Sequence, residues 1–136
     1  GDVYKRQVLD RSKSLFKIVE RSYRESFIQT VKMDHVVWKA EVYRAFLGLN
    51  NKTTAAFADH TQCRLGKWYY TGEGSQQYKG MAGYQRLETP HKRVHAMGIE
   101  ALKCEDPEDG MKYLKQMEDA SMEVITCLDE LGALWF

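Results

Sequence analysis

A chain of 136 residues is long enough for one domain with its own hydrophobic core, and its hydrophobic content of 43% and charged content of 29% are typical of folded globular proteins. The net charge of +1 gives no electrostatic basis for binding nucleic acid, and no apolar run is long enough for insertion into a membrane. Three cysteines at irregular spacing form no disulfide framework, so we expect a reducing, cytoplasmic location.

The N-terminal end of the chain is expected to lie outside the functional domain. Residues 1–7 (GDVYKRQ) look like the translation of a transposon adaptor used in sequencing libraries, so we predict that they are a scar. Residues 8–26 carry a weak apolar seam, which predicts a linker helix from an upstream module that this sequence lacks. The domain itself is then expected to occupy residues 27–136.

The first long helix is predicted from Val8 to about Leu49, because no proline interrupts this stretch and its first glycine is Gly48. From Phe27 onward, apolar residues recur at spacings of three and four, which is the pattern of an amphipathic helix. His35 falls on this apolar stripe, so we expect its imidazole to face the core.

A second helix is predicted to start at residues 53–54, after a turn of glycine and asparagine at residues 48–52. Either of two threonines can cap its first turn, and it is expected to end at residues 68–69. His60 and Cys63 would lie one turn apart on such a helix and share one of its faces. The second helix therefore brings a thiol and an imidazole together.

The C-terminal part is predicted to hold two more helices. Residues 70–84 contain several glycines and are expected to form an irregular loop with one short turn of helix. Thr89 and Pro90 are typical of an N-cap and a first helical position, which predicts a third helix ending near Cys104. Residues 106–109 cap the fourth helix in the same way. These features predict an all-α, antiparallel four-helix bundle with a long N-terminal helix.

Four side chains on inward faces of three predicted helices indicate a metal site. His91 and His95 are separated by four residues, so both imidazoles lie on one helix face within reach of one ion. With His35 and Cys63 they make one thiolate and three imidazoles, which suits tetrahedral Zn²⁺. The thiolates are too few for an iron–sulfur cluster, and no Glu-x-x-His pair indicates a di-iron site. Copper stays open on grounds of affinity.

The predicted ligand set argues against catalysis. Four protein ligands close the coordination shell of zinc, whereas a catalytic zinc usually keeps one position for water. We therefore expect no enzymatic activity, and an open-site zinc enzyme is the least favoured hypothesis. His60 is a competing ligand because it lies one turn before Cys63, but it is placed second because His35, His91 and His95 already complete the set.

The residues around these four side chains resemble the CZB family, the chemoreceptor zinc-binding domain. The matching blocks are KMDHVVWK at 32–39, HTQCRLGKWY at 60–69 and PHKRVH at 90–95. The resemblance covers roughly residues 27–131 and implies a four-helix bundle that binds zinc through the same four ligands. It also implies a bacterial, cytoplasmic protein that forms homodimers.

Members of the family are found at the end of soluble chemoreceptors or attached to diguanylate cyclases, and the attached module reads out zinc occupancy or oxidation of the cysteine. The resemblance therefore implies a regulatory sensor of zinc, and through Cys63 of oxidants, that controls a chemotaxis signalling or cyclase module. The alternative hypothesis is a structural module, in which zinc staples the bundle permanently and the domain only dimerises its parent protein.

Overall fold

The computed structural model describes residues 1–133, which form helices and connecting turns without any strand. The elements are α1 (Asp2–Phe46), the 3₁₀ helix η1 (Thr54–Ala56), α2 (Arg64–Tyr70), α3 (Glu73–Gln77), α4 (Ala82–Lys103) and α5 (Pro107–Ala133). The prediction of an all-α helical bundle is therefore confirmed. Residues 134–136, at the end of the predicted domain, lie outside the described part of the chain.

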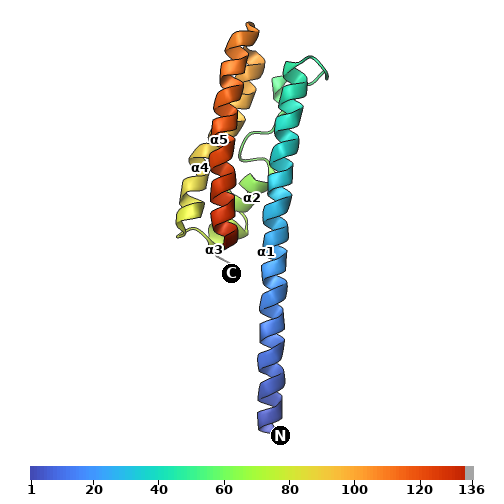
Figure 1. Cartoon of the computed structure of the whole chain (residues 1–136), viewed down its shortest axis with the longest axis vertical. Coiled ribbons are helices and arrows are strands. Elements are labelled where there is room, and N and C mark those ends of the chain that lie inside the picture. Colours follow the sequence, from blue (N-terminus) through green and yellow to red (C-terminus); the bar gives the residue numbers. More distant parts are fainter. Residues whose placement is uncertain (134–136) are drawn as a thin grey trace.

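Three long helices make the frame of the molecule (Figure 1). α4 and α5 form an antiparallel pair joined by a short connection at residues 104–106, and the C-terminal half of α1 lies alongside them. The N-terminal half of α1 extends well beyond the other helices. The chain passes along α1, returns through residues 47–70, and then follows α4 and α5, which is the up-down-up-down order of a four-helix bundle.

The core lies where the three long helices meet. Fully burying an aliphatic side chain contributes roughly 1.5–3 kcal/mol, so a few such residues on each helix are enough to hold the frame together. The largest fully buried side chains are Val31 and Val42 of α1, Leu87 and Val94 of α4, and Met117, Val124, Leu128 and Leu131 of α5.

Helix α1 begins at Asp2, so residues 2–7 are helical and continuous with the helix predicted from Val8. This continuity does not bear on where these residues come from, and the interpretation of residues 1–7 as a scar and of residues 8–26 as a linker stays a prediction. None of the helices in residues 1–133 combines the length and the apolar character that a membrane span requires.

The second element of the bundle differs from the prediction. A continuous helix from residues 53–54 to residues 68–69 is wrong, because only η1 and the short α2 are helical in this stretch. The backbone N–H of Thr61 donates to the Asp59 carboxylate, and such local bonds compete with helix formation. The chain then turns so tightly that a Cβ on Gly66 would lie 2.0 Å from the backbone oxygen of His60.

The starts of the later helices are partly as predicted. The glycine-rich loop contains one short helix, α3, as expected, but α4 begins at Ala82 and not at the proline. Pro90 lies inside α4, where it removes one backbone hydrogen bond. The buried stripe of α4 already includes Leu87 and so extends on both sides of the proline, which explains why the helix continues through it. The cap of α5 is confirmed, since the N–H of Glu108 donates to Asp106 Oδ1 at 3.0 Å.

Candidate metal centre

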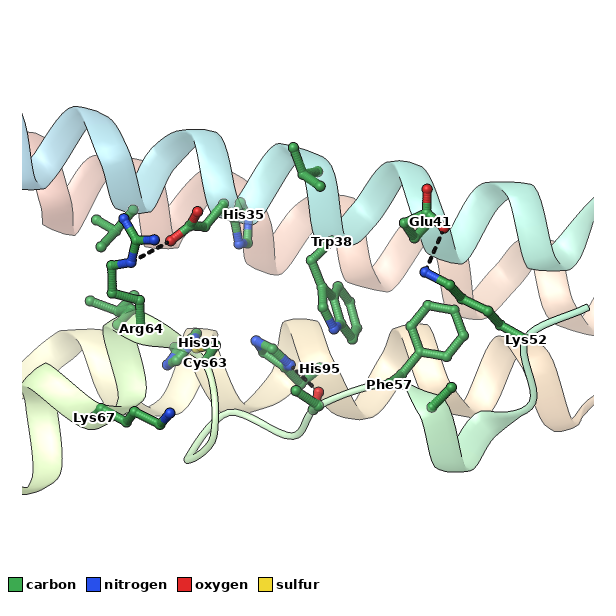
Figure 2. A pocket seen from close by; sticks show the side chains of 16 residues that line it. His35, Trp38, Glu41, Lys52, Phe57, Cys63, Arg64, Lys67, His91 and His95 are labelled. Atoms are coloured by element: carbon green, nitrogen blue, oxygen red, sulfur yellow. Dashed lines mark hydrogen bonds and ion pairs between the residues drawn. The ribbon is translucent and has the colours of Figure 1, made fainter. Parts of the chain in front are cut away.

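A cavity of about 710 Å³ lies between α1, residues 52–67 and α4 (Figure 2). Trp38 of α1 and Phe57 of the returning segment form an apolar part of its lining. The cavity is also lined by all four predicted metal ligands. The three elements that bound it therefore place the thiol and the imidazoles around one shared space.

Three of the four predicted ligands converge on a single point. The ligand atoms of Cys63, His91 and His95 all lie within 4.8 Å of one another, and both histidines are buried. The Sγ atom of Cys63 is 3.3 Å from Nε2 of His91. A tetrahedral zinc ion with bonds of about 2.0–2.3 Å separates neighbouring ligand atoms by about 3.3–3.6 Å. The donor set, one soft thiolate and two imidazoles, fits zinc, and the 3.3 Å between Sγ of Cys63 and Nε2 of His91 matches the spacing of two zinc ligands.

Helix α4 fixes the two histidines. Their separation by four residues places His91 and His95 on successive turns, with ring centroids 4.9 Å apart and ring planes at 86°. His95 Nδ1 lies 2.8 Å from the carbonyl oxygen of Ala58, so the Nδ1–H donates to it and the lone pair is on Nε2. An imidazole held in this way by a second partner is the usual arrangement at zinc sites.

Burial keeps both α4 imidazoles neutral. Loss of solvation on burial, with smaller contributions from the nearby histidines, lowers the pKa of His91 to about 3. Burial also lowers the pKa of His95, although the bond to Ala58 opposes this shift. Because only a neutral imidazole offers a lone pair to a metal, both side chains are in the ligating form at neutral pH.

The thiol reaches the group from the start of α2. Cys63 is the N-cap residue of this helix, and its Sγ accepts a hydrogen bond from the N–H of Gly66 at 3.4 Å. Burial raises the pKa of the Cys63 thiol, and the backbone N–H groups partly offset the increase. A bound cation would supply the missing stabilisation of the thiolate. Cys63 was predicted as a ligand from the sequence, but it reaches the site from the N-cap of α2 and not through the predicted helical spacing from His60.

His35 lies across the cavity from His91 and Cys63 (Figure 2) and is not a member of the converging group in the described residues. Its side chain is buried, as predicted, but Nε2 lies 2.7 Å from the hydroxyl oxygen of Ser121 on α5. Burial, followed by the charge of Lys39, lowers the pKa of His35 to about 4. The fourth ligand stays a prediction, because His35 is near the group but has another partner.

His60, the competing ligand of the sequence prediction, lies beside His91 and does not line the cavity. It is half-buried and is absent from the converging group of the described residues. Its ring centroid is 6.0 Å from that of His91 and 5.7 Å from that of Tyr70, both in edge-to-face arrangements. The backbone oxygen of His60, and not its imidazole, is the atom that contacts Cys63 Sγ, at 3.8 Å.

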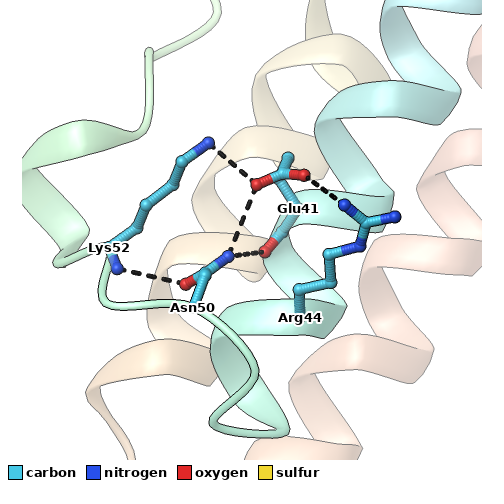
Figure 3. Close-up of polar contacts among 4 residues, drawn as sticks. All are labelled: Glu41, Arg44, Asn50 and Lys52. Atoms are coloured by element: carbon cyan, nitrogen blue, oxygen red, sulfur yellow. Dashed lines mark hydrogen bonds and ion pairs between the residues drawn. The ribbon is translucent and has the colours of Figure 1, made fainter.

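Two ion pairs join residues 52–67 to α1 on either side of the cavity (Figure 2). Arg64 Nε lies 3.3 Å from Asp34 Oδ2, and Lys52 Nζ lies 2.8 Å from Glu41 Oε2. Asn50 strengthens the second contact, because its amide bonds Glu41 and its carbonyl accepts from the backbone N–H of Lys52 (Figure 3). These exposed contacts position the returning segment, while the ligands lie between them.

Two residues that shape the site, Gly98 and Ser121, were not predicted from the sequence. Gly98 of α4 lets the Trp38 ring approach, since a Cβ there would lie 2.8 Å from it. The Trp38 ring in turn lies against His95, with a centroid distance of 4.3 Å. Ser121 lies between Met117 and Val124 at spacings of four and three, so a single hydroxyl on an apolar helix face was the available signal in the sequence.

Together, the fold and the site define an all-helical domain with a buried cysteine–histidine group suited to a metal ion. The sequence model of the chemoreceptor zinc-binding domain family, CZB, matches residues 35–102, which is half of the chain and includes every predicted ligand. The chain therefore belongs to the CZB family. No protein of curated function and no solved structure gave a significant match.

Proposed function

We propose that this domain is a regulatory zinc sensor without catalytic activity of its own, in which His35, Cys63, His91 and His95 hold one Zn²⁺ ion. The observation that carries the proposal is the convergence of one thiol and two buried imidazoles within 4.8 Å. Membership of a family described as a chemoreceptor zinc-binding domain supports the choice of metal.

The position of the site favours a role in signalling. His35 belongs to α1, Cys63 to the start of α2, and His91 and His95 to α4, so an ion bound by all four links three separate elements. Because metal binding and folding are coupled in such sites, a change in occupancy alters the free energy of holding α1 against the rest of the bundle. Helix α1 extends beyond the bundle and is therefore suited to pass this change to an attached module.

The attached module is proposed from the family. A chemotaxis signalling module or a diguanylate cyclase upstream of α1, in a bacterial cytoplasm, is the output that the resemblance implies. Cys63 adds a second input, because its sulfur is the oxidisable ligand and is only partly buried. Oxidation would remove the thiolate and with it the strongest charge interaction of the site with zinc.

The outer face of α1 supports homodimer formation. Leu15, Val19, Met33 and Val37 are all more than half exposed, and they are separated by four residues or by whole heptads, so they mark one stripe that is apolar at both ends and polar at Ser22 and Ser26 between them. This stripe lies opposite the face that carries the buried Val31. A second copy of α1 would cover it, and light scattering on Val37→Glu should then show a shift toward monomer.

The same stripe is the specific observation that favours the alternative, a structural module in which zinc is a permanent staple of a dimerising bundle. A titration with buffered free zinc separates the two functions. A sensor exchanges its metal at the free zinc concentrations of a bacterial cytoplasm, whereas a staple keeps the metal until the protein unfolds.

The direct test of zinc binding is metal analysis of the purified chain and its variants. We expect one zinc per chain in the wild type and a large loss in Cys63→Ala and His95→Ala. Cys104→Ala is the matched control, because this cysteine is not part of the converging group of the described residues. An unchanged zinc content in both ligand variants would show that the metal site is elsewhere.

A further inference from the structure

A chain of polar side chains crosses the largely apolar contact between α1 and α5, directly beside the metal group. Lys39 Nζ donates to Glu118 Oε2 at 3.1 Å and to Ser121 Oγ at 2.9 Å. Nε2 of His35 lies 2.7 Å from the same hydroxyl oxygen. Ser121 is 3% exposed, so water does not compete with these partners. This series of hydrogen bonds therefore ends at the imidazole of His35, which is the proposed fourth ligand of the metal.

The direction of these hydrogen bonds follows from proton counting. An ammonium group has only donors, so Ser121 Oγ accepts from Lys39. The hydroxyl proton then needs an acceptor, and within residues 1–133 the one bonded to Ser121 is Nε2 of His35. Ser121 therefore donates to Nε2, and the neutral ring carries its own proton on Nδ1. In this tautomer neither ring nitrogen has a free lone pair for a metal ion.

We propose that Ser121 is a positioning residue that competes with the metal for His35: it holds the imidazole against α5, and the hydrogen bond must break before His35 can join Cys63, His91 and His95. This inference rests on the proposed zinc function. It adds that His35 is hydrogen-bonded to Ser121 before zinc binds. Zinc affinity therefore depends partly on Ser121, although Ser121 does not contact the ion.

The competition gives a route from the metal site to α1. Lys39 and His35 lie on adjacent turns of α1, and Glu118 and Ser121 lie on adjacent turns of α5, so the polar chain ties the two helices together at one level. When His35 leaves Ser121, α1 loses one of its bonds to α5 and gains a link to α2 and α4. Zinc occupancy therefore adds a link from α1 to α2 and α4 at the expense of one link to α5, while the bonds of Lys39 to α5 remain, and such a change of partner is the kind of two-state element that coupling requires.

The test is the zinc affinity of the full chain, measured by competition with a chromophoric chelator. Ser121→Ala removes the competing donor, so we expect zinc to bind about threefold to tenfold more tightly, the range expected from the net contribution of one hydrogen bond. Ser121→Thr keeps the hydroxyl and should restore the wild-type affinity. Thr126→Ala, which removes an exposed hydroxyl from the same helix, is the control and should change nothing.

An unchanged or weaker affinity in Ser121→Ala, with normal zinc binding by the wild type, would overturn this inference and leave the proposed function standing. Absence of zinc binding by the wild type would overturn both.

A second readout does not involve the metal. In the chelator-treated wild type, ¹⁵N NMR of the imidazole nitrogens should show the Nδ1–H tautomer for His35. An Nε2–H tautomer would mean that His35 donates to Ser121 and keeps a lone pair on Nδ1, which also contradicts the inference.

Discussion

The two sides of the metal site are built differently. On the α4–α5 side, His91 and His95 are buried on one continuous helix that packs along α5, and His95 has its second nitrogen bonded to Ala58. On the α1 side, the cavity of about 710 Å³ separates the helix from residues 52–67, and His35 is bonded to Ser121. One side therefore presents side chains that are already aligned, and the other presents His35, which in our proposal must change partner to bind the metal.

In the proposed sensor, this difference lets one site both bind a metal ion and respond to it. A pair of aligned imidazoles contributes affinity without reorganisation, because its geometry is fixed by helix packing. A ligand that gives up another interaction lowers the net affinity and couples binding to movement of its helix. We therefore expect the histidines of α4 to determine whether the metal binds. We expect His35 of α1 to determine the final affinity and whether binding moves α1. The predictions below separate these roles.

The largest effect is expected from removing an aligned ligand. His95→Ala should lower zinc affinity by more than about 100-fold, because losing even an outer partner of a ligand typically costs 10–100-fold. His60→Ala is the matched control, since His60 is outside the converging group of the described residues, and it should stay near the wild-type value. Chelator competition measures both. Equal losses of zinc affinity in the two variants would show that His95 contributes no more to zinc binding than His60 does.

The next effect is the loss of stability of the metal-free protein in acid. The pKa of His91 is about 3 and that of His35 about 4 in the folded protein, against an ordinary value of 6.5. The unfolded chain therefore binds more protons, and the free energy of unfolding falls as the pH drops from about 6.5 toward 4. The slope reaches up to about 1.4 kcal/mol per pH unit for each imidazole.

Urea unfolding of the chelator-treated chain at a series of pH values measures this slope. His91→Gln should make the dependence shallower, because one of the buried imidazoles is then missing. A free energy of unfolding that stays constant between pH 6.5 and pH 4.5 would show that the imidazoles are not held neutral by burial.

A smaller effect is expected where the two sides touch. A Cβ at Gly98 of α4 would lie 2.8 Å from the Trp38 ring of α1, so Gly98→Ala should push the helices apart and destabilise the fold by about 1–3 kcal/mol. Gly132→Ala on α5 is the control, since nothing lies within 4 Å of its Cβ. It should be neutral or stabilising by up to about 1 kcal/mol, because alanine is the better helix former. Thermal unfolding of both variants decides whether the contact matters.

The smallest effect is expected at the rim of the cavity. Arg64 and Asp34 form an ion pair between α2 and α1, but both side chains are well exposed, at 56% and 42%. Arg64→Ala should therefore change the free energy of unfolding by less than about 1 kcal/mol. A larger loss of stability in urea unfolding would show that the α1 side is held more rigidly than its open cavity indicates.

Periodicity alone predicted the aligned side of the site. His91 and His95 follow each other by four residues on an apolar stripe, and this spacing leaves little freedom once the segment is helical. Cys63 was also placed in the group, but through a helix that does not exist. The Asp59–Thr61 bond and the tight turn at Gly66 determine the position of Cys63. Hydrophobic periodicity does not predict local contacts of this kind.

The fold was predicted in the same uneven way. The all-α class, the long first helix and the cap of α5 at Asp106 follow from local residue preferences that the packing does not override. Pro90 misled the prediction, because a proline is typical of a helix start and here the buried face continues through it. The role of Ser121 depends on His35 of α1, which is far away in sequence, so this role could be recognised only from the three-dimensional structure.

We propose that one zinc ion is bound by one sulfur and three imidazole nitrogens, with His35 as the ligand recruited from α1. X-ray absorption at the zinc edge of the loaded full chain tests it most directly. We expect one Zn–S distance of about 2.3 Å and three Zn–N distances of about 2.0–2.1 Å, with one nitrogen lost in His35→Ala. A wild-type shell with two imidazoles and an oxygen, unchanged in His35→Ala, would contradict it.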